Sequence, residues 1–344
     1  IALALALHMD PLEFRKKNCM RPGYVDPHTH VKCNTYGLAE CMEKGREFIR
    51  WDEKRREYEN QTGPVRKGIG MAIFCYKTGV YPISLETASC RMILNQDGSM
   101  QLQMGATEIG QGADTVFTQM AAEVTGITED KVNVLSTQDT DVSPFDTGAY
   151  ASRQTYVSGM AVKKTGAIFK EKILDYAAYM LEKHQDTLDV RDNHIVDKET
   201  GTQLLPMEEL ATTAFYSLDR SVHITAEATS HCKTNTFATG ACFAEVEVDM
   251  PLGKVKVTNI VNVHDSGKLI NPKLAAAQVH GGMSMGLGYG LSEELLFDAK
   301  GRPLNDNLLD YKLPTAMDTP DLNALFVELD DPTGPFGNKA LGEP

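Results

Sequence analysis

Residues 243–263 read FAEVEVDMPLGKVKVTNIVNV, and this stretch decides the fold class. Apolar and polar residues alternate on both sides of Pro251-Leu252-Gly253, which predicts two strands joined by a turn. Residues 272–291 follow with PKLAAAQVHGGMSMGLGYGL, a glycine-spotted run long enough for a helix. Strands and helices are interleaved without regular βαβ spacing, so the sequence predicts an α+β fold.

A second hairpin signal lies upstream. Runs of β type within residues 68–104 are separated by the turn Asn95-Gln96-Asp97-Gly98. Residues 186–219 are polar and mixed in pattern, so we place the boundary between two subdomains, 1–186 and 187–344, in this region. Further helices are predicted near residues 1–18, 37–60, 114–124 and 157–184, and a further strand near 132–136.

The composition excludes some classes of protein. With 344 residues and 42% hydrophobic content, the chain can bury a substantial core. The 34 basic residues are outnumbered by 47 acidic ones, a formal net charge of -13, which disfavours a nucleic-acid-binding surface. The apolar start, residues 1–7, lacks a basic flank and a cleavage site, so it indicates the end of a helix whose beginning is missing. No other stretch is long enough to cross a membrane.

Seven cysteines stand singly along the chain, and none forms a C-x-x-C pair. This spacing disfavours a disulfide scaffold and cannot build an iron–sulfur site from a local cluster. Reduced thiols in the cytoplasm are the favoured interpretation.

One short motif suggests a metal site. Asp26-Pro27-His28-Thr29-His30 resembles the H-x-H pair of metal-dependent amidohydrolases, in which two imidazoles share a metal ion. That pair belongs at the end of a core strand, whereas His28 and His30 follow a helix in a polar stretch. A solvated loop pair is therefore the favoured interpretation, and a hydrolase remains the alternative.

The glycine-rich stretch Gly105–Thr115 precedes a predicted helix. Free N–H groups at a helix start suit a phosphate, and the Gln111 amide offers a donor and an acceptor. A strand-to-helix turn capped by Asp114 or Thr115 would give the same pattern. Spacing alone leaves both readings open.

Three later stretches carry similar alternatives. Small residues and hydroxyls in 149–155 suit a close approach to phosphates or a simple helix cap. The glycines of 278–290 cost a helix about 1 kcal/mol each, so a second helix or a cofactor must pack against them. Glu343, between Gly342 and Pro344, is either a held carboxylate or a solvated one.

Taken in order, these segments resemble the xanthine dehydrogenase and aldehyde oxidase family of molybdenum hydroxylases, and most of all its bacterial molybdenum-binding subunits. The resemblance covers nearly the whole chain and implies a partial, two-subdomain molybdopterin-binding domain with both ends cut. The matching segments are Gly105–Thr115, 137–142, Ala151–Thr155, 264–267 with Asn271-Pro272, Gln278–Gly290, 308–312 and Lys339–Pro344.

The resemblance also implies roles for individual residues. Gln111 would contact the molybdenum centre, and Glu343 would be a buried active-site base. Tyr81 lies near the position of the family's aromatic substrate clamp. The pterin cofactor, molybdopterin or its cytosine dinucleotide form, would be held by Gly110, Gly112, Ala151, Ser152, Gln278, Gly281 and Gly282.

The activity implied by the resemblance is hydroxylation of a purine, hypoxanthine or xanthine, at an electron-poor ring carbon. Electrons would pass to a [2Fe-2S] cluster and FAD on partner subunits. Oxidation of aldehydes or other N-heterocycles by the same centre is the alternative. The family's first molybdenum loop and its substrate-binding arginine have no counterpart here, so the chain alone is expected to be inactive.

Overall fold

The computed structural model describes residues 1–135 and 139–344, and these form two compact units. Unit 1 comprises residues 1–76, 237–330 and 340–344, and unit 2 comprises residues 77–236 and 331–339. The expected division at 186/187 therefore falls inside unit 2. The strand that begins at Phe237 pairs with a strand near residue 70, and no local sequence pattern signals such a long-range pairing.

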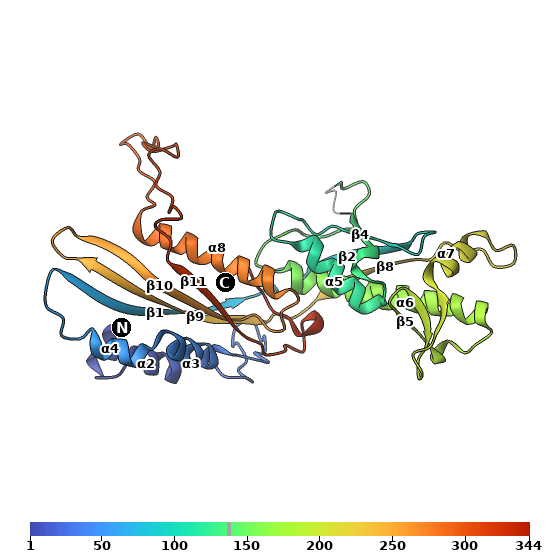
Figure 1. Ribbon diagram of the computed structural model, residues 1–344, viewed down its shortest axis with the longest axis horizontal. Coiled ribbons are helices and arrows are strands. Elements are labelled where there is room, and N and C mark those ends of the chain that lie inside the picture. The colour runs from blue at the N-terminus through green and yellow to red at the C-terminus, as the bar shows by residue number, and fades with distance from the viewer. Residues whose placement is uncertain (136–138) are drawn as a thin grey trace. The chain divides into compact units, whose positions relative to one another are not determined.

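A four-stranded sheet forms the centre of unit 1, in the order β1-β9-β10-β11 (Figure 1). β9 and β10 are the predicted hairpin and pair antiparallel, with Val263 opposite Ala241, and β10 pairs parallel with β11. The strands are β1 (Val65–Lys77), β9 (Phe237–Asp249), β10 (Lys254–Asp265) and β11 (Asp321–Val327).

Helices cover both faces of this sheet. α3 packs against β9 and β10, and α8 packs against β10 and β11 from the other side (Figure 1). Side chains alternate along a strand, so Ile260 joins the α8 core while Val261 and Val263 face the opposite way. The helices of unit 1 are α1 (Ala2–Ala6), α2 (Pro11–Asn18), α3 (Leu38–Ile49), α4 (Trp51–Glu57) and α8 (Pro272–Leu291).

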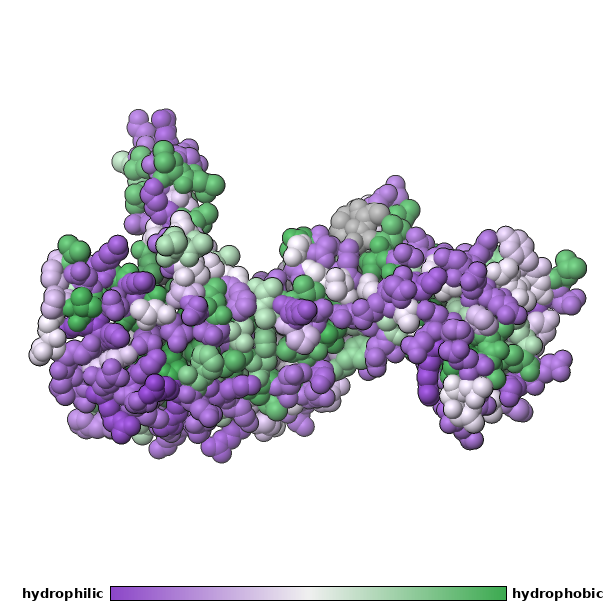
Figure 2. Space-filling view, in the orientation of Figure 1, coloured by the Kyte–Doolittle hydropathy of each residue, from purple (hydrophilic) through white to green (hydrophobic). Residues whose placement is uncertain are grey.

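Residues 292–320 connect α8 to the parallel strand β11 without forming a helix or a long strand. A parallel pair needs such a crossover, because the chain must return to the same end of the sheet. Several of its apolar side chains are exposed, among them Leu308, Leu309 and Met317. Figure 2 shows green, hydrophobic residues on the segment that projects beyond α8.

Unit 2 contains a sheet in the order β4-β3-β2-β8, with β2 and β3 forming the other predicted hairpin. α6 packs against β2 and β8, and α5 lies beside α6. The elements are β2 (Glu86–Leu94), β3 (Met100–Met104), β4 (Val132–Leu135), β8 (Thr225–Cys232), α5 (Ala113–Thr125) and α6 (Gly159–Leu181), the last preceded by a π-helical turn, Gln154–Ser158.

The polar region 186–219, expected to be a boundary, folds into a small sheet and a helix inside unit 2. Its strands are too short for their alternation to stand out from the polar background. The elements are β5 (Leu188–Arg191), β6 (His194–Asp197), β7 (Gln203–Pro206) and α7 (Met207–Tyr216), and the short 3-10 turns of unit 2 are Glu129–Lys131, Gln185–Thr187 and Pro335–Gly337.

The α+β prediction is confirmed, as are both hairpins and the long helix α8. The helix expected over residues 37–60 is two helices, because Arg50 adopts a left-handed conformation between them. Ser136, the end of the strand expected near 132–136, and Thr137 and Gln138 of the 137–142 segment lie outside the described residues. None of the described helices has the length and apolar composition needed to span a bilayer.

Candidate functional site

The glycine-rich loop before α5 binds its own carboxylate. Glu108 Oε1 accepts hydrogen bonds from the N–H groups of Gly110 (2.7 Å) and Gly112 (3.1 Å), and Oε2 accepts from Asp114 (3.0 Å). Burial by itself raises the pKa of Glu108, but these three N–H groups lower it below its usual range. The expected phosphate at this helix start therefore meets donors that Glu108 already occupies, and neither Asp114 nor Thr115 acts as the cap.

Gln111 is locked by the same loop. Its Nε2 donates to Thr107 O (2.8 Å) and Gln154 Oε1 (3.0 Å), and its Oε1 accepts from Ile109 N (2.7 Å). An amide nitrogen has two hydrogens, so both donors are used, while a carbonyl oxygen accepts twice. The group that Gln111 presents to a ligand is thus its oxygen, in a fixed orientation.

The turn at Ala151 and Ser152 places two successive non-glycine residues at positive φ, 47° and 49°. Such conformations cost on the order of 1–3 kcal/mol each and persist only where the surroundings enforce them. Gly79 N–H donates to Ala151 O at 2.9 Å, which brings the segment leading to Tyr81 beside the turn. Tyr81 itself is half-buried, and its carbonyl accepts from Lys77 Nζ at 3.3 Å.

Arg153 directly follows this turn and anchors it to the rest of unit 2. Its guanidinium is fully buried and pairs with Glu86 Oε2 and Asp146 Oδ1, each at 2.5 Å. It also donates to the carbonyls of Gly148 and Thr87, each at 2.8 Å. Neither Arg153 nor Glu108 is predicted from the sequence, although both lie inside the segments 149–155 and 105–115. The role of Arg153 depends on the buried carboxylates of Glu86 and Asp146. The role of Glu108 depends on the backbone conformation of its own loop.

In unit 1, helix α8 has one packed face and one open face. Ala275, Val279, Met283 and Leu287 are buried, and the last three join a core with β10. Gln278, Gly281, Gly282, Met285 and Tyr289 share the opposite side through i, i+3, i+4, i+7 and i+11 spacing. A Cβ added at Gly281, Gly282 or Gly286 would meet nothing within 4 Å among the described residues. Tight helix–helix packing therefore does not account for these glycines.

Glu343 lies in the same unit as α8. Leu341 packs against the core beneath α8, and Gly342 turns the chain with a φ of +129°. Glu343 Oε2 then accepts a hydrogen bond from the Tyr76 hydroxyl at 2.8 Å. The Glu343 side chain is exposed in the described chain, not buried as expected. Tyr76 was not predicted, because its neighbour is 267 residues away in the sequence.

The pterin cofactor that the resemblance implies has a flat ring system and an anionic phosphate. The bare face of α8 fits such a group, since a ligand can lie directly on the backbone of Gly281 and Gly282 beside the Gln278 amide. In unit 2 the Gln111 oxygen remains available, whereas the N–H groups at the start of α5 are taken. The predicted residues divide between the units: Tyr81, Gln111, Ala151 and Ser152 belong to unit 2, and Gln278, Gly281, Gly282 and Glu343 belong to unit 1.

The histidine pair occupies an exposed loop. Asp26 Oδ1 accepts from the N–H groups of His28 (2.9 Å) and Thr29 (2.7 Å), and His30 has a left-handed φ of 56°. No cluster of three or more histidine, cysteine, aspartate or glutamate side chains that could hold a metal ion occurs in residues 1–135 or 139–344.

The histidine of the 264–267 motif is a packing residue. His264 is 1% exposed and its ring lies 4.9 Å from that of Phe74. Burial lowers the pKa of His264 to about 4, so the imidazole is neutral near pH 7. The adjacent Asp265 is also buried and accepts from Gly37 N at 2.9 Å, which ties β10 to the start of α3.

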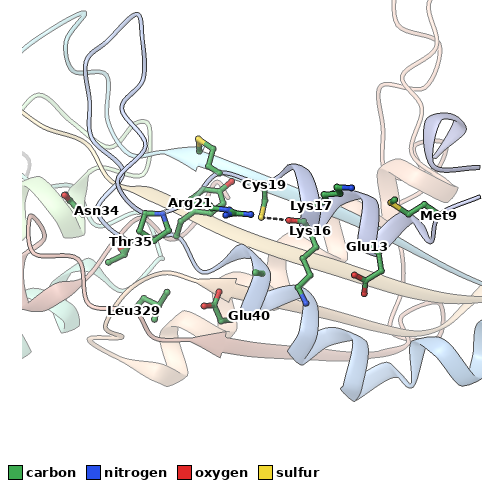
Figure 3. A pocket seen from close by; sticks show the side chains of 14 residues that line it. Met9, Glu13, Lys16, Lys17, Cys19, Arg21, Asn34, Thr35, Glu40 and Leu329 are labelled. Atoms are coloured by element: carbon green, nitrogen blue, oxygen red, sulfur yellow. Dashed lines mark hydrogen bonds between the residues drawn. The ribbon is translucent and has the colours of Figure 1, made fainter. Parts of the chain in front are cut away.

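An open cavity of about 850 Å³ lies between α2, the loop that follows it and the start of α3 (Figure 3). None of the predicted site residues lines it. Its wall mixes cations, such as Lys17 and Arg21, with the carboxylate of Glu40, so it has no uniform charge.

Comparison with known proteins gives one family and consistent relatives. Residues 44–320 match the family described as molybdopterin cofactor-binding domain. The chain is 47% identical over 343 residues to the xanthine dehydrogenase molybdenum-binding subunit of Escherichia coli O157:H7, and 32% identical to the "Probable hypoxanthine oxidase XdhD" of Escherichia coli (strain K12). The alignments cover 99% of this chain, 46% of the first relative and 36% of the second. The chain therefore spans less than half the length of either relative.

A solved structure shows the same architecture. The CO dehydrogenase of Oligotropha carboxidovorans superposes with a TM-score of 0.88 at 26% identity, over 99% of this chain and 44% of that one. The resemblance drawn from the sequence motifs is thereby confirmed at the level of family and fold.

Proposed function

This chain belongs to the molybdopterin cofactor-binding domain family, and we propose that it is part of the molybdenum-binding subunit of a purine hydroxylase. The observation that carries the proposal is the 47% identity to a xanthine dehydrogenase molybdenum-binding subunit along 99% of this chain. The name of the second relative, a hypoxanthine oxidase, points to the same substrate class. We further propose that the whole protein works in the cytoplasm with an iron–sulfur subunit and an FAD subunit as electron acceptors.

The residues of the chain then have distinct tasks. When bound, the molybdenum–pterin group supplies two-electron redox chemistry. In unit 1, Gln278 and the open backbone of Gly281 and Gly282 would hold its pterin part. In unit 2, Gln111 would offer a fixed amide oxygen, and the Ala151–Ser152 turn next to Arg153 would be a further cofactor contact.

Glu343 is the proposed general base. A carboxylate that is ionised near neutral pH can take the proton that must leave as the substrate is hydroxylated. Tyr81 is the proposed substrate contact, because an aromatic ring can stack on a purine. Both assignments follow from the motifs and from the exposure of these side chains to an entering ligand.

The proposal is tested on the full-length polypeptide assembled with its subunits. We expect molybdenum in the purified protein and oxidation of hypoxanthine or xanthine with an artificial electron acceptor. If the enzyme prefers aldehydes or other N-heterocycles, the family assignment stands and the proposed purine substrate is wrong. Zinc in place of molybdenum, with activity lost in His28→Ala, would favour the hydrolase alternative.

The base assignment has its own variant. Glu343→Gln preserves the shape of the side chain and removes its basicity, so turnover should fall on the order of a hundredfold or more while the molybdenum content is retained. Steady-state kinetics and metal analysis of the same preparation measure both. Near-normal turnover at neutral pH would refute the assignment.

A further inference from the structure

The hydrogen bond between Tyr76 and Glu343 joins two residues that nothing in the local sequence connects. The Tyr76 hydroxyl donates to Glu343 Oε2 at 2.8 Å. Both residues belong to unit 1, so the contact lies inside one compact body. A hydrogen bond from a neutral donor to an ionised carboxylate is stronger than one between neutral groups.

On the donor side of this hydrogen bond, Tyr76 lies on a well-packed strand. It lies next to the last residue of β1, two positions after Phe74, and side chains at i and i+2 share a face of a strand. The Phe74 ring covers Gly240, whose added Cβ would lie 2.3 Å from the Phe74 Cζ atom, and it packs at a tilt against His264. This packing holds the strand that carries Tyr76.

Glu343 is less firmly placed. It is exposed and lies outside any helix or strand, and Gly342 before it has a φ of +129° that gives the chain no stiff support. Leu341 anchors the segment against the core beneath α8, and Gly342 separates this anchor from Glu343. The bond from Tyr76 adds a restraint at the carboxylate itself.

We propose that Tyr76 is a positioning residue for Glu343, which orients the carboxylate. The inference rests on the proposed function, in which Glu343 is the general base. In this role Tyr76 touches neither substrate nor cofactor. It acts by holding Oε2, so that the plane of the carboxylate is set before a substrate arrives.

The test uses Tyr76→Phe in the full-length holoenzyme, because this change removes the hydroxyl and keeps the ring. We expect unchanged molybdenum content, a kcat about tenfold lower and a KM within about twofold, since a hydrogen bond to a charged group is worth roughly ten- to a hundredfold. In a Glu343→Gln background, Tyr76→Phe should cause no further loss of rate.

Tyr58→Phe is the matched control. Tyr58 also donates to a glutamate of unit 1, Glu245 on β9, and neither residue belongs to the proposed site. This variant should keep the wild-type kcat and KM. A wild-type kcat in Tyr76→Phe, or a loss of rate that follows a loss of molybdenum, would overturn the positioning role. If Glu343→Gln is inactive while Tyr76→Phe is normal, only this inference fails; if Glu343→Gln is active, the base assignment fails as well.

Discussion

Two glycine-rich regions of the chain differ in what contacts their backbone. One is the loop and turn of unit 2, and the other is the glycine face of α8 in unit 1. In unit 2 the chain satisfies its own strained backbone: Glu108 occupies the N–H groups at the start of α5, and Arg153 supports the Ala151–Ser152 turn. In unit 1 a Cβ added at Gly281 or Gly282 would meet nothing within 4 Å among the described residues. Both regions carry motifs of the molybdopterin family. Gly110 in unit 2 is open in the same sense, but its N–H group is taken by Glu108.

The difference teaches that a glycine-rich motif does not by itself indicate an open ligand site. Gly105 is tightly enclosed, since an added Cβ would lie 2.3 Å from Pro144 O, whereas Gly282 has open space around it. The first glycine serves the chain's own packing, and the second leaves room for a group from outside the described chain. The following changes separate these two cases by their effect on stability.

The largest effect is expected from Arg153→Ala. The change leaves the buried carboxylates of Glu86 and Asp146 without a cation, and breaking a buried ion pair by removing one partner typically costs about 3–5 kcal/mol. Denaturant unfolding of the full-length protein measures the loss. Arg91→Ala removes an exposed pair with Glu227 and should cost less than about 1 kcal/mol. Equal losses in the two variants would mean that unit 2 is not internally supported as described.

Paired glycine changes test the comparison directly. Gly105→Ala forces a methyl group against a backbone oxygen and should lower the free energy of unfolding by about 1–3 kcal/mol. Gly282→Ala, on an open helix face, should raise it by up to about 1 kcal/mol, because alanine favours the helix. Thermal or denaturant unfolding without cofactor distinguishes these opposite signs.

The same position of α8 also reports on the cofactor. Gly282→Val places a branched side chain on the open face, so the full-length protein should fold and yet contain less molybdenum. Unchanged metal content would mean that the open face of α8 does not bind the cofactor, whatever the stability of the variant.

The smallest effect is expected from Glu108→Ala, at about 1 kcal/mol, the usual worth of a helix-capping side chain. Because the pKa of Glu108 is lowered in the folded state, its contribution is complete above the ordinary glutamate value near 4.3 and is lost as the pH falls through the lowered value. The difference between wild type and variant should therefore shrink on acidification below about pH 4. A difference that persists in acid would mean that the charge of Glu108 plays no part.

Sequence periodicity predicted the elements whose pattern is local. The turn at Asn95–Gly98 and the helix Pro272–Leu291 follow from neighbouring residues and were found. The division into two units does not follow from local patterns, because the pairing of β1 with β9 joins segments far apart in the chain. For the same reason the motifs pointed to Glu343 but not to Tyr76. Glu108 lies within its own motif, but its hydrogen bonds depend on the conformation of the loop, which residue spacing does not give.

The connectivity of unit 1 has a consequence for synthesis on the ribosome. Strand β1 ends at Lys77, and its partner β9 begins at Phe237, about 160 residues later. At about 5–20 residues per second, β1 waits on the order of 10–30 s for its neighbour, while most of unit 2 has already emerged as one continuous segment. The N-terminal helices meanwhile expose the apolar faces that later cover the sheet. During translation, this interval is when a nascent-chain chaperone has the most to protect.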